Sequence, residues 1–333
     1  MLACMSDDLL PELTAAFGLV DVHPESLSWW SLVHRARVVP RGQAVPVDVV
    51  VKLTGRTAER AAGMAAWTRA LAAGGFPVVA PVDLDGPNPR QVGEHWYAVY
   101  PFVAGRPYDA ERDVAALGDL LGRLHATPLE PEVRDALRSY AWPESGRDDA
   151  DADLASLAEK LPRVLGEEAG AAALESVRGL VERWWTVSFP ALRAAEEAGE
   201  LPRAGVTSDY KSANVVIAED GPVIVDPDNG GWEPRLFDLA MAVVLLHNDS
   251  DSAPGRMMTA AEWEAFHAAY ARHVTLTDRE RALWPAALDH MLWEEGTWAL
   301  EDNDDDAYAQ PRQGGYLRDL ATMPEERYRL PGE

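Results

Sequence analysis

The chain has 333 residues, and 47% of them are hydrophobic, which is enough to bury a large core, most simply in two units. Acidic residues (55) outnumber basic residues (30), and the formal net charge is -25. Such a surface repels nucleic acid and anionic lipid, so neither is expected as a partner. The charge favours solubility first, and attraction of a cationic partner second. No apolar run approaches the roughly 20 residues of a membrane helix.

The numbers of cysteines and lysines indicate the cellular compartment and point to candidate functional residues. The single cysteine, Cys4, excludes an intrachain disulfide and fits a cytoplasmic location. The opening "MLACMSDD" lacks the basic and apolar segments of a signal peptide. Among the basic residues, only Lys52, Lys160 and Lys211 are lysines. Because Arg and Lys are not interchangeable, we expect the retained lysines at places that require Lys in preference to Arg.

The first hundred residues predict a small α+β unit. A short helix is expected at 7–18, and a strand-rich stretch follows at 27–53, in which "VDVVVKL" (47–53) is typical of a buried strand. The Ala-rich segment 57–75 predicts a helix that ends at glycines, and 95–105 predicts another strand.

After Gly105 the pattern becomes helical. Residues 111–126 place Val114, Leu117, Leu121 and Leu124 on one helix face. The polar segment 143–153 is predicted as a loop, and the hairpin at 214–226 is the one clear β signal in the second half. Capping boxes predict helix starts late in the chain, at Thr259/Glu262 and Thr277/Glu280.

These elements predict an α+β fold with two lobes, a small mixed one and a large helical one. The expected small N-terminal lobe covers residues 1–101, and the mainly helical lobe covers 102–333. A cleft is expected between the two lobes, where ligands commonly bind.

The predicted hairpin carries a constellation that suits phosphoryl transfer. Asn214 precedes its first strand and Asp226 ends its second, so the two side chains are expected close together. An amide oxygen and a carboxylate there can hold Mg²⁺, with phosphate oxygens and waters completing the octahedron. Asp209, one loop away, could accept a proton from an attacking hydroxyl. Each piece occurs often by chance, and their order along the chain carries the prediction.

At this point a family resemblance emerges. The stretch 208–243, "SDYKSANVVIAEDGPVIVDPDNGGWEPRLFDLAMAV", resembles the aminoglycoside phosphotransferase and choline kinase group of kinase-like enzymes. Their usual string is approximately HGDxHxxN, a hairpin, then IDxxxxxxGxxxxDLA. Softer similarity lies in "WYAVYPFVAGRPYD" (96–109), "LGDLLGRLHA" (117–126) and "GGFPVVAPV" (74–82), so the resemblance spans about 47–245.

The resemblance implies an α+β, two-lobed protein-kinase-like fold, with a small β-rich N-terminal lobe and a large mainly helical one. It also implies ATP and Mg²⁺ as cofactors and a role for each matching residue. Asp209 becomes the catalytic base, Asn214 and Asp226 the metal ligands, and Lys52 the phosphate-binding lysine. It also implies that Asp238 is a buried carboxylate that braces the catalytic loop.

The strand that leads into the inter-lobe hinge is expected to contact adenine. Pro101 can offer a backbone carbonyl but no N–H, and Val103 can offer the N–H.

Three departures from the family string matter. Thr207-Ser208 replaces its His-Gly, and Lys211 replaces its second His, which resembles the DLKxxN loop of protein kinases and could neutralise the γ-phosphate. The small-lobe helix lacks a Glu near Met64, so Glu59 is the expected partner of Lys52. No glycine-rich loop covers the phosphates, and "SWWS" (28–31) with Ser31 would have to serve.

The best acceptor candidates lie in the segment 288–308. On a helix, Trp298 shares a face with four acidic residues, Glu294, Glu295, Glu301 and Asp302. The resemblance implies that acidic residues there receive amino groups, while a solvated acidic helix end is the equally weighted alternative. Asp228 is the further candidate.

The sequence therefore predicts an ATP-dependent kinase for a small, amine-bearing acceptor, such as an aminoglycoside-like antibiotic, an amino sugar or an amino alcohol. A kinase for Ser or Thr of a peptide remains open, since the Lys211 loop would suit it. A pseudokinase acting as a binding module is the alternative from a different class.

Overall fold

The computed structural model describes residues 6–28, 32–143, 146–248 and 252–331. The chain forms two compact units. Unit 1 comprises Met1–Gly105, Leu129–Arg138 and Val223–Gly230, and unit 2 comprises Arg106–Pro128, Ser139–Pro222 and Gly231–Glu333. The predicted fold class is confirmed, with a small antiparallel sheet in one unit and mostly helices in the other. A single cut near residue 101 does not describe the division, because two later segments belong to unit 1.

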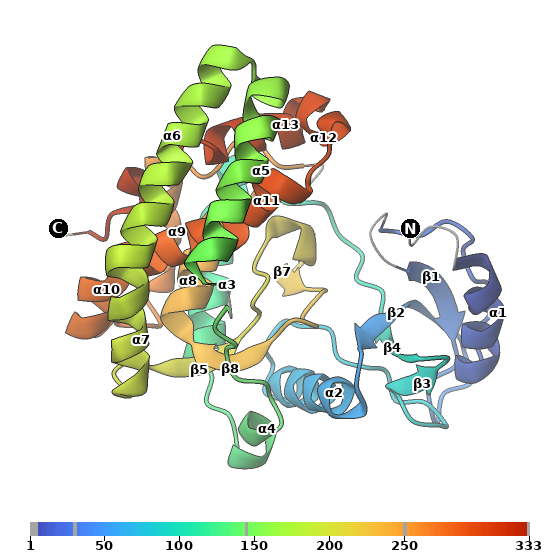
Figure 1. Cartoon of the computed structure of the whole chain (residues 1–333). Helices are drawn as coiled ribbons and strands as arrows, with labels where there is room; N and C mark the ends of the chain where they lie inside the picture. Colours follow the sequence, from blue (N-terminus) through green and yellow to red (C-terminus); the bar gives the residue numbers. More distant parts are fainter. Residues whose placement is uncertain (1–5, 29–31, 144–145, 249–251, 332–333) are drawn as a thin grey trace. The chain divides into compact units, whose positions relative to one another are not determined.

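Unit 1 is built on a four-stranded antiparallel sheet in the order β1-β2-β4-β3 (Figure 1). The predicted strands at 47–53 and 95–105 and the predicted helices at 7–18 and 57–75 are confirmed, with β4 ending earlier than expected. The elements of this unit are α1 (Ser6–Phe17), β1 (Val33–Val38), β2 (Val47–Gly55), α2 (Ala58–Ala73), β3 (Arg90–Val92), β4 (His95–Pro101) and α4 (Pro131–Asp135).

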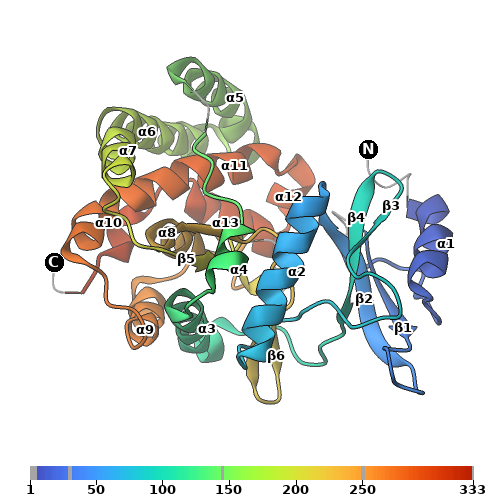
Figure 2. The same cartoon turned by 90° about the horizontal axis from the view of Figure 1, so that it is seen from below.

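The two faces of this sheet carry different kinds of side chain, because successive side chains along a strand point to opposite faces. Val49 and Val51 of β2 point into a core that Leu13 and Phe17 of α1 complete. The next residue after Val51, Lys52, is buried on the other face, and α1 and α2 lie on opposite sides of the sheet (Figures 1 and 2). One face therefore packs the hydrophobic core of the unit, and the other face carries the buried ammonium of Lys52.

Unit 2 is mainly helical, and α5 and α6 run side by side in it (Figure 2). Its helix α8 is buried almost along its whole length. Its α-helices are α3 (Ala110–Ala126), α5 (Arg147–Leu165), α6 (Glu167–Arg183), α7 (Phe189–Glu197), α8 (Arg235–Leu245), α9 (Ala260–Tyr270), α10 (Asp278–Met291), α11 (Trp298–Asp302), α12 (Asp305–Ala309) and α13 (Pro311–Leu320). Both predicted capping boxes are present, at the starts of α9 and α10.

Shorter elements complete unit 2. Two π-helical turns precede α7 and α11, at Trp184–Ser188 and Leu292–Thr297, and 3₁₀ turns lie at Ser212–Asn214 and Glu325–Tyr328. Two short strands, β5 (Arg203–Val206) and β8 (Gly231–Pro234), pair antiparallel. The predicted hairpin is confirmed as β6 (Val215–Ala218) and β7 (Gly221–Ile224), and the chain enters unit 1 within β7.

Two predictions about unit 2 are wrong. Residues 147–153, expected as a loop, form the start of α5, because the Asp149 carboxylate accepts from the Gly146 N–H at 3.0 Å and acidic residues favour a helix N-terminus. The hairpin is also not the only β structure there, since β5 and β8 pair. These four-residue strands are too short to give an alternating pattern.

Within the described residues, no helix is both long enough and apolar enough to cross a membrane.

Candidate active site

In unit 1, one buried ammonium lies between two carboxylates. Lys52 Nζ is 2.5 Å from Asp226 Oδ1 and 3.0 Å from Asp228 Oδ2. The Lys52 side chain is 6% exposed, while those of Asp226 and Asp228 are 46% and 14% exposed. Burial alone would lower the pKa of Lys52, but the two carboxylates outweigh it and hold that pKa above its ordinary value. Lys52 is therefore charged.

The Asp228 carboxylate is held on both oxygens. Its Oδ1 accepts from the hydroxyls of Thr54 at 3.1 Å and Tyr100 at 2.9 Å, while its Oδ2 contacts Lys52. Burial raises the pKa of Asp228, and the Lys52 ammonium opposes that rise. The Arg60 guanidinium of α2 holds the backbone of the same loop. It donates to the carbonyls of Asp228 at 2.8 Å and Gly230 at 2.7 Å.

This geometry corrects two expectations. Asp228, expected to contact the acceptor, is buried beside Lys52 with both oxygens occupied. Glu59, expected to pair with Lys52, is exposed in the first turn of α2, and Lys52 pairs with the two aspartates instead. The reason is local, since the loop after β7 brings carboxylates to the face of the sheet on which Lys52 lies. The candidate Ser31 lies outside the described residues.

The end of β4 fits the expected adenine contacts. The Phe102 N–H donates to the Asp48 carbonyl at 3.1 Å, which makes these two residues a hydrogen-bonded pair. Val49 and Pro101, one step along, therefore form a non-hydrogen-bonded pair. The Pro101 carbonyl accordingly points away from β2, and Val103 follows on the exit from the strand, partly buried. Their contact with a nucleotide stays a prediction.

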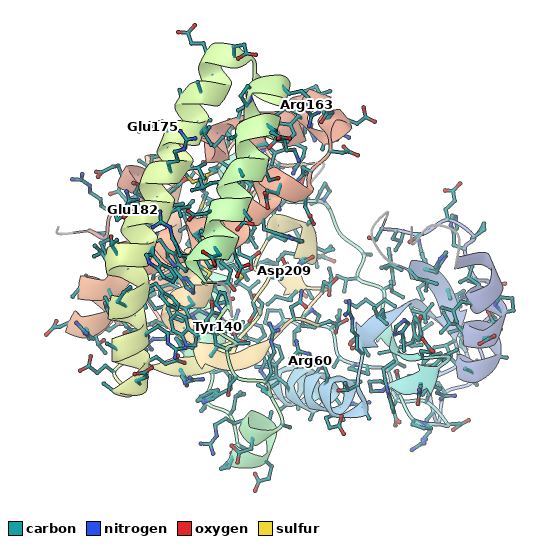
Figure 3. The ribbon with its side chains drawn as sticks, in the orientation of Figure 1. Arg60, Tyr140, Arg163, Glu175, Glu182 and Asp209 are labelled. Atoms are coloured by element: carbon teal, nitrogen blue, oxygen red, sulfur yellow. The ribbon has the colours of Figure 1, made fainter. Side chains whose placement is uncertain are left out.

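In unit 2, the loop between β5 and β6 gathers the predicted catalytic residues. The Asn214 amide donates to the carboxylate and to the carbonyl of Asp209, each at 2.9 Å. Lys211 Nζ lies 3.3 Å from Asp209 Oδ1. The buried Tyr210 donates from its hydroxyl to the Leu117 carbonyl of α3 at 2.7 Å and so anchors the loop. Figure 3 shows Asp209 on this loop.

Asp238, at the start of α8, braces this loop as predicted. It is 2% exposed, and its carboxylate accepts from the backbone N–H of Ser208 at 2.8 Å and of Thr207 at 3.3 Å. Thr207 Oγ1 and the His125 ring lie at 3.3 and 3.0 Å. Ser208 has φ +49°, a left-handed conformation that favours glycine, and the family string has Gly at this position. Asp238 therefore holds a bent backbone immediately before Asp209.

A second acid contacts the same loop from β8. The Ser208 hydroxyl donates to Glu233 Oε2 at 2.8 Å, and Glu233 is 4% exposed. Gly231 makes room for this side chain, because a Cβ built there would lie 2.3 Å from Glu233 Oε1. The close approach explains the glycine in "GGWEP" and fixes a carboxylate next to Asp209.

Tyr140, labelled in Figure 3, lies in the segment before α5. Through hydrogen bonds it connects a buried histidine to Glu294 of the predicted acceptor region. The Trp184 indole N–H donates to His290 Nδ1 at 3.1 Å, and burial lowers the pKa of His290 to about 3, so its proton resides on Nε2. That Nε2–H donates to the Tyr140 hydroxyl at 2.7 Å, and the hydroxyl in turn donates to Glu294. The chain of hydrogen bonds ends on one carboxylate oxygen.

The surroundings of Tyr140 are both aromatic and acidic. Its ring lies 5.3 Å from that of Trp142 and 4.9 Å from that of Phe237. Burial raises the pKa of Tyr140, and the nearby carboxylates of Glu294, Glu233 and Glu295 raise it further. We call Tyr140, Glu233, Glu294 and Glu295 the acidic–aromatic group.

The remaining acceptor candidates, Trp298 and Asp302, are more exposed to solvent than the members of this group. Trp298 is 56% exposed and Asp302 is exposed on α11, whereas Glu294 is only partly exposed and contacts Tyr140. The π-helical turn before α11 adds a residue to the turn, so the regular helix spacing behind the shared-face prediction does not hold. Trp298 and Asp302 stay predictions.

Sequence reasoning did not find Arg60, Tyr140 and Glu233. Arg60 acts through backbone carbonyls, which leave no trace in residue types. Glu233 lies within the stretch "GGWEPRLFDLA" that resembles the family, a few residues before Asp238 in the sequence, and this position could have indicated a role near the catalytic loop. Tyr140 lies 154 residues before Glu294, and nothing in its local sequence indicates a contact with that acid.

The donor chemistry fits a hard divalent cation. Asp226 is half-exposed and holds one ion pair, while Asn214 uses its amide nitrogen on Asp209 and keeps its oxygen for another partner. Mg²⁺ is usually bound by one or two carboxylates together with phosphates, and the Asp226 carboxylate and the Asn214 amide oxygen, each taken within its own unit, are oxygen donors of that kind. Their joint role as metal ligands stays a prediction. In the described part of the chain, no cluster of three or more His, Cys, Asp or Glu side chains could hold a metal ion.

Comparison with known families gives one match over most of the chain. Residues 36–284 match the model of the "Phosphotransferase enzyme family".

Curated relatives match a shorter part. Stress response kinase A from Salmonella choleraesuis and serine/threonine protein kinase RdoA from Salmonella typhimurium are each 27% identical over 198 residues. The match covers 57% of this chain and 52% of each relative, so the chain spans about half the length of the curated relatives it matches.

Solved structures share the fold over nearly the whole chain. A microcompartment-associated aminopropanol kinase has a TM-score of 0.61 at 16% identity and covers 97% of both chains. Spectinomycin phosphotransferase has a TM-score of 0.57 at 14% identity, covering 96% of this chain and 98% of that one. An aminoglycoside phosphotransferase from Alicyclobacillus acidocaldarius has a TM-score of 0.57 at 15% identity, covering 93% and 89%.

Proposed function

The chain belongs to the phosphotransferase enzyme family, and on that premise we propose that it is a kinase that transfers the γ-phosphate of ATP to a hydroxyl of a small molecule that carries an amine. The observation that carries the choice of acceptor is the acidic–aromatic group, whose Glu233 contacts the residue before Asp209. Carboxylates beside aromatic faces suit an ammonium group. A kinase of the same fold is named for aminopropanol, an amino alcohol.

In this proposal, Asp209 accepts the proton of the acceptor hydroxyl. The Asn214 amide, which bonds both the carboxylate and the carbonyl of Asp209, sets the direction of that carboxylate. Lys211 and Lys52 balance negative charge on the transferred phosphate. Asp226 and Asn214 would hold Mg²⁺, which supplies charge neutralisation at the phosphates when bound. The contacts proposed for Pro101 and Val103 hold the adenine, and the predicted cytoplasmic location remains an expectation.

The first experiment measures nucleotide binding. A thermal-shift titration with ATP, with and without Mg²⁺, should stabilise the wild type in a Mg²⁺-dependent way, because a ligand that binds the native state raises its melting temperature. Asp226→Ala should abolish the Mg²⁺ dependence. Absence of any shift with ATP in the wild type would favour a binding module that does not transfer phosphate.

The second experiment identifies the acceptor with γ-labelled ATP and a panel of amino alcohols, amino sugars and aminoglycosides. Asp209→Asn should keep the nucleotide shift and lose about 10²- to 10⁴-fold in transfer rate, as expected for a general base. Glu294→Gln should raise KM for the amine acceptor about tenfold with little change in kcat, since it removes a ground-state charge contact.

A second acceptor class has an observation of its own in its favour. One curated relative is named a serine/threonine protein kinase, and the Lys211 loop resembles that of protein kinases. Ser- and Thr-containing peptides therefore belong in the same panel. Phosphorylation of a peptide, with every amine left unmodified, would replace the small-molecule proposal.

A further inference from the structure

The lysine of unit 1 lacks the partner that protein kinases use. In those enzymes a glutamate on the small-lobe helix pairs with the phosphate-binding lysine. Here Glu59 is the one acidic residue of α2, and it is exposed in the first helical turn. Within the described residues, the ion pairs of Lys52 go to Asp226 and Asp228 alone.

We propose that Asp228 is the positioning residue for Lys52 and takes the place of the helix glutamate. This inference rests on the proposed function, because it assumes that Lys52 binds the phosphates of ATP. Asp228 acts through Lys52 and touches neither substrate nor metal.

Burial and bonding separate the two aspartates. Asp226 is 46% exposed, and Lys52 is its one hydrogen-bond partner in the part of the chain that the structure describes. Asp228 is 14% exposed and contacts three donors, namely Lys52, Thr54 and Tyr100. Asp226 can therefore exchange its contact with Lys52 for a cation at little cost, while Asp228 cannot leave its donors without breaking three contacts.

The sheet itself prepares this arrangement. Lys52 and Thr54 lie two residues apart on β2 and therefore point to the same face, and the register shift between Leu53 and Gly55 marks a bulge at Thr54. Tyr100 pairs with Val50 and lies on that face as well. Lys52, Thr54 and Tyr100 thus converge on one carboxylate from two neighbouring strands.

Helix α2 contributes to the lysine indirectly, with the opposite charge from that of the kinase helix. Arg60 donates to the carbonyls of Asp228 and Gly230 and so holds the backbone that carries the carboxylate. In protein kinases the small-lobe helix carries the glutamate that contacts the lysine directly. Here α2 carries Arg60, which contacts the loop, and the loop carries Asp228, which contacts Lys52. Movement of α2 would therefore reach Lys52 through Asp228.

The test compares ligands with and without phosphates. The dissociation constants of Mg²⁺–ATP and of adenosine are measured by calorimetry for the wild type and for Asp228→Asn, which keeps the shape and removes the charge. We expect about tenfold or weaker binding of ATP, because a charge-assisted contact to Lys52 is lost, with adenosine affinity changed less than about twofold. Glu59→Gln, the matched control in α2, should change neither value.

The outcomes divide cleanly. No binding of ATP by the wild type would overturn the proposed function and this inference with it. Equal losses for ATP and adenosine in Asp228→Asn would show a structural role only. Recovery of ATP affinity at high Mg²⁺ would make Asp228 a metal ligand, and a loss in Glu59→Gln without one in Asp228→Asn would restore the helix glutamate. Each of these last three overturns the inference alone.

A second variant keeps the test valid if Asp228→Asn does not fold. Arg60→Gln leaves Lys52 and both carboxylates in place but frees the loop that carries Asp228. ATP should then bind about threefold more weakly with adenosine unchanged, since the carboxylate remains present but less well placed. Unchanged ATP affinity in this variant would count against the coupling of α2 to Lys52.

Discussion

Asp228 in unit 1, with its side chain 14% exposed, and Asp238 in unit 2, which is buried, are both largely withdrawn from solvent, yet the groups that contact them differ. Asp228 faces a buried ammonium, shared with a second carboxylate. Asp238 is 2% exposed and accepts hydrogen bonds from two backbone N–H groups and the Thr207 hydroxyl, with the His125 ring 3.0 Å away.

The difference separates a cluster in which one member, Asp226, can exchange its contact with Lys52 from a scaffold in which no contact can be exchanged. Two carboxylates on one ammonium leave an excess negative charge, which a cation can take up without rebuilding the fold. Backbone donors around Asp238 are fixed by the chain itself, and any movement there would break hydrogen bonds in the loop before Asp209. The first arrangement suits ligand binding and the second suits rigid positioning.

The strongest test removes the cation of unit 1. Lys52→Met should lower the free energy of unfolding by about 3 kcal/mol, because breaking a buried ion pair leaves the carboxylates of Asp226 and Asp228 uncompensated. Urea denaturation of the variant and the wild type measures this difference.

Mg²⁺ supplies the control for that experiment. If the lost stability comes from charge, millimolar Mg²⁺ should recover part of it in Lys52→Met and add less to the wild type. Equal effects of Mg²⁺ on both proteins would mean that packing of the lysine stem, and not its charge, explains the loss.

The next test concerns a neutral hydrogen-bond chain of unit 2. His290 is buried, and its pKa is lowered to about 3, so the unfolded state binds a proton at higher pH than the folded state does. Stability from the neutral ring is therefore complete above about pH 6.5 and decreases as the pH falls toward 3. Between pH 7.5 and pH 5, His290 should account for a loss of about 2 kcal/mol.

The measurement is urea denaturation at several pH values for the wild type and His290→Gln. The variant should be less stable at pH 7.5 but should lose about 2 kcal/mol less on acidification. His23→Gln, which alters an exposed ring, is the matched control. A parallel pH dependence in the wild type and His290→Gln would show that His290 is protonated in the folded state.

The sequence predicted the parts that depend on local order along the chain. The β6–β7 hairpin, the strand of Lys52 and the loop of Asp209 follow from alternation, turn residues and spacing, and the buried brace at Asp238 followed from the family resemblance. What could not be predicted depends on contacts between distant segments. Lys52 and Asp228 lie 176 positions apart, and Tyr140 and Glu294 lie 154 apart.

The two errors have different origins. Glu59 was the natural partner for Lys52 by helix position, but three donors on one sheet face stabilise Asp228 there instead. The loop predicted at 143–153 was judged from composition, although acidic residues at a helix N-terminus are favourable. Composition describes solvent exposure well and secondary structure poorly.

The smallest test examines how rigid the scaffold in unit 2 is, at Ser208. This residue has φ +49° and donates from its hydroxyl to Glu233. Ser208→Ala and Ser208→Gly both remove that hydrogen bond, but only glycine adopts the left-handed conformation without strain. Ser208→Gly should therefore be more stable than Ser208→Ala, by about 0.5 to 1 kcal/mol once the larger entropy of unfolded glycine is included. If Ser208→Ala were the more stable variant, the two backbone donors to Asp238 would not require this conformation, and the loop before Asp209 would adapt to its contacts as the Lys52 cluster does.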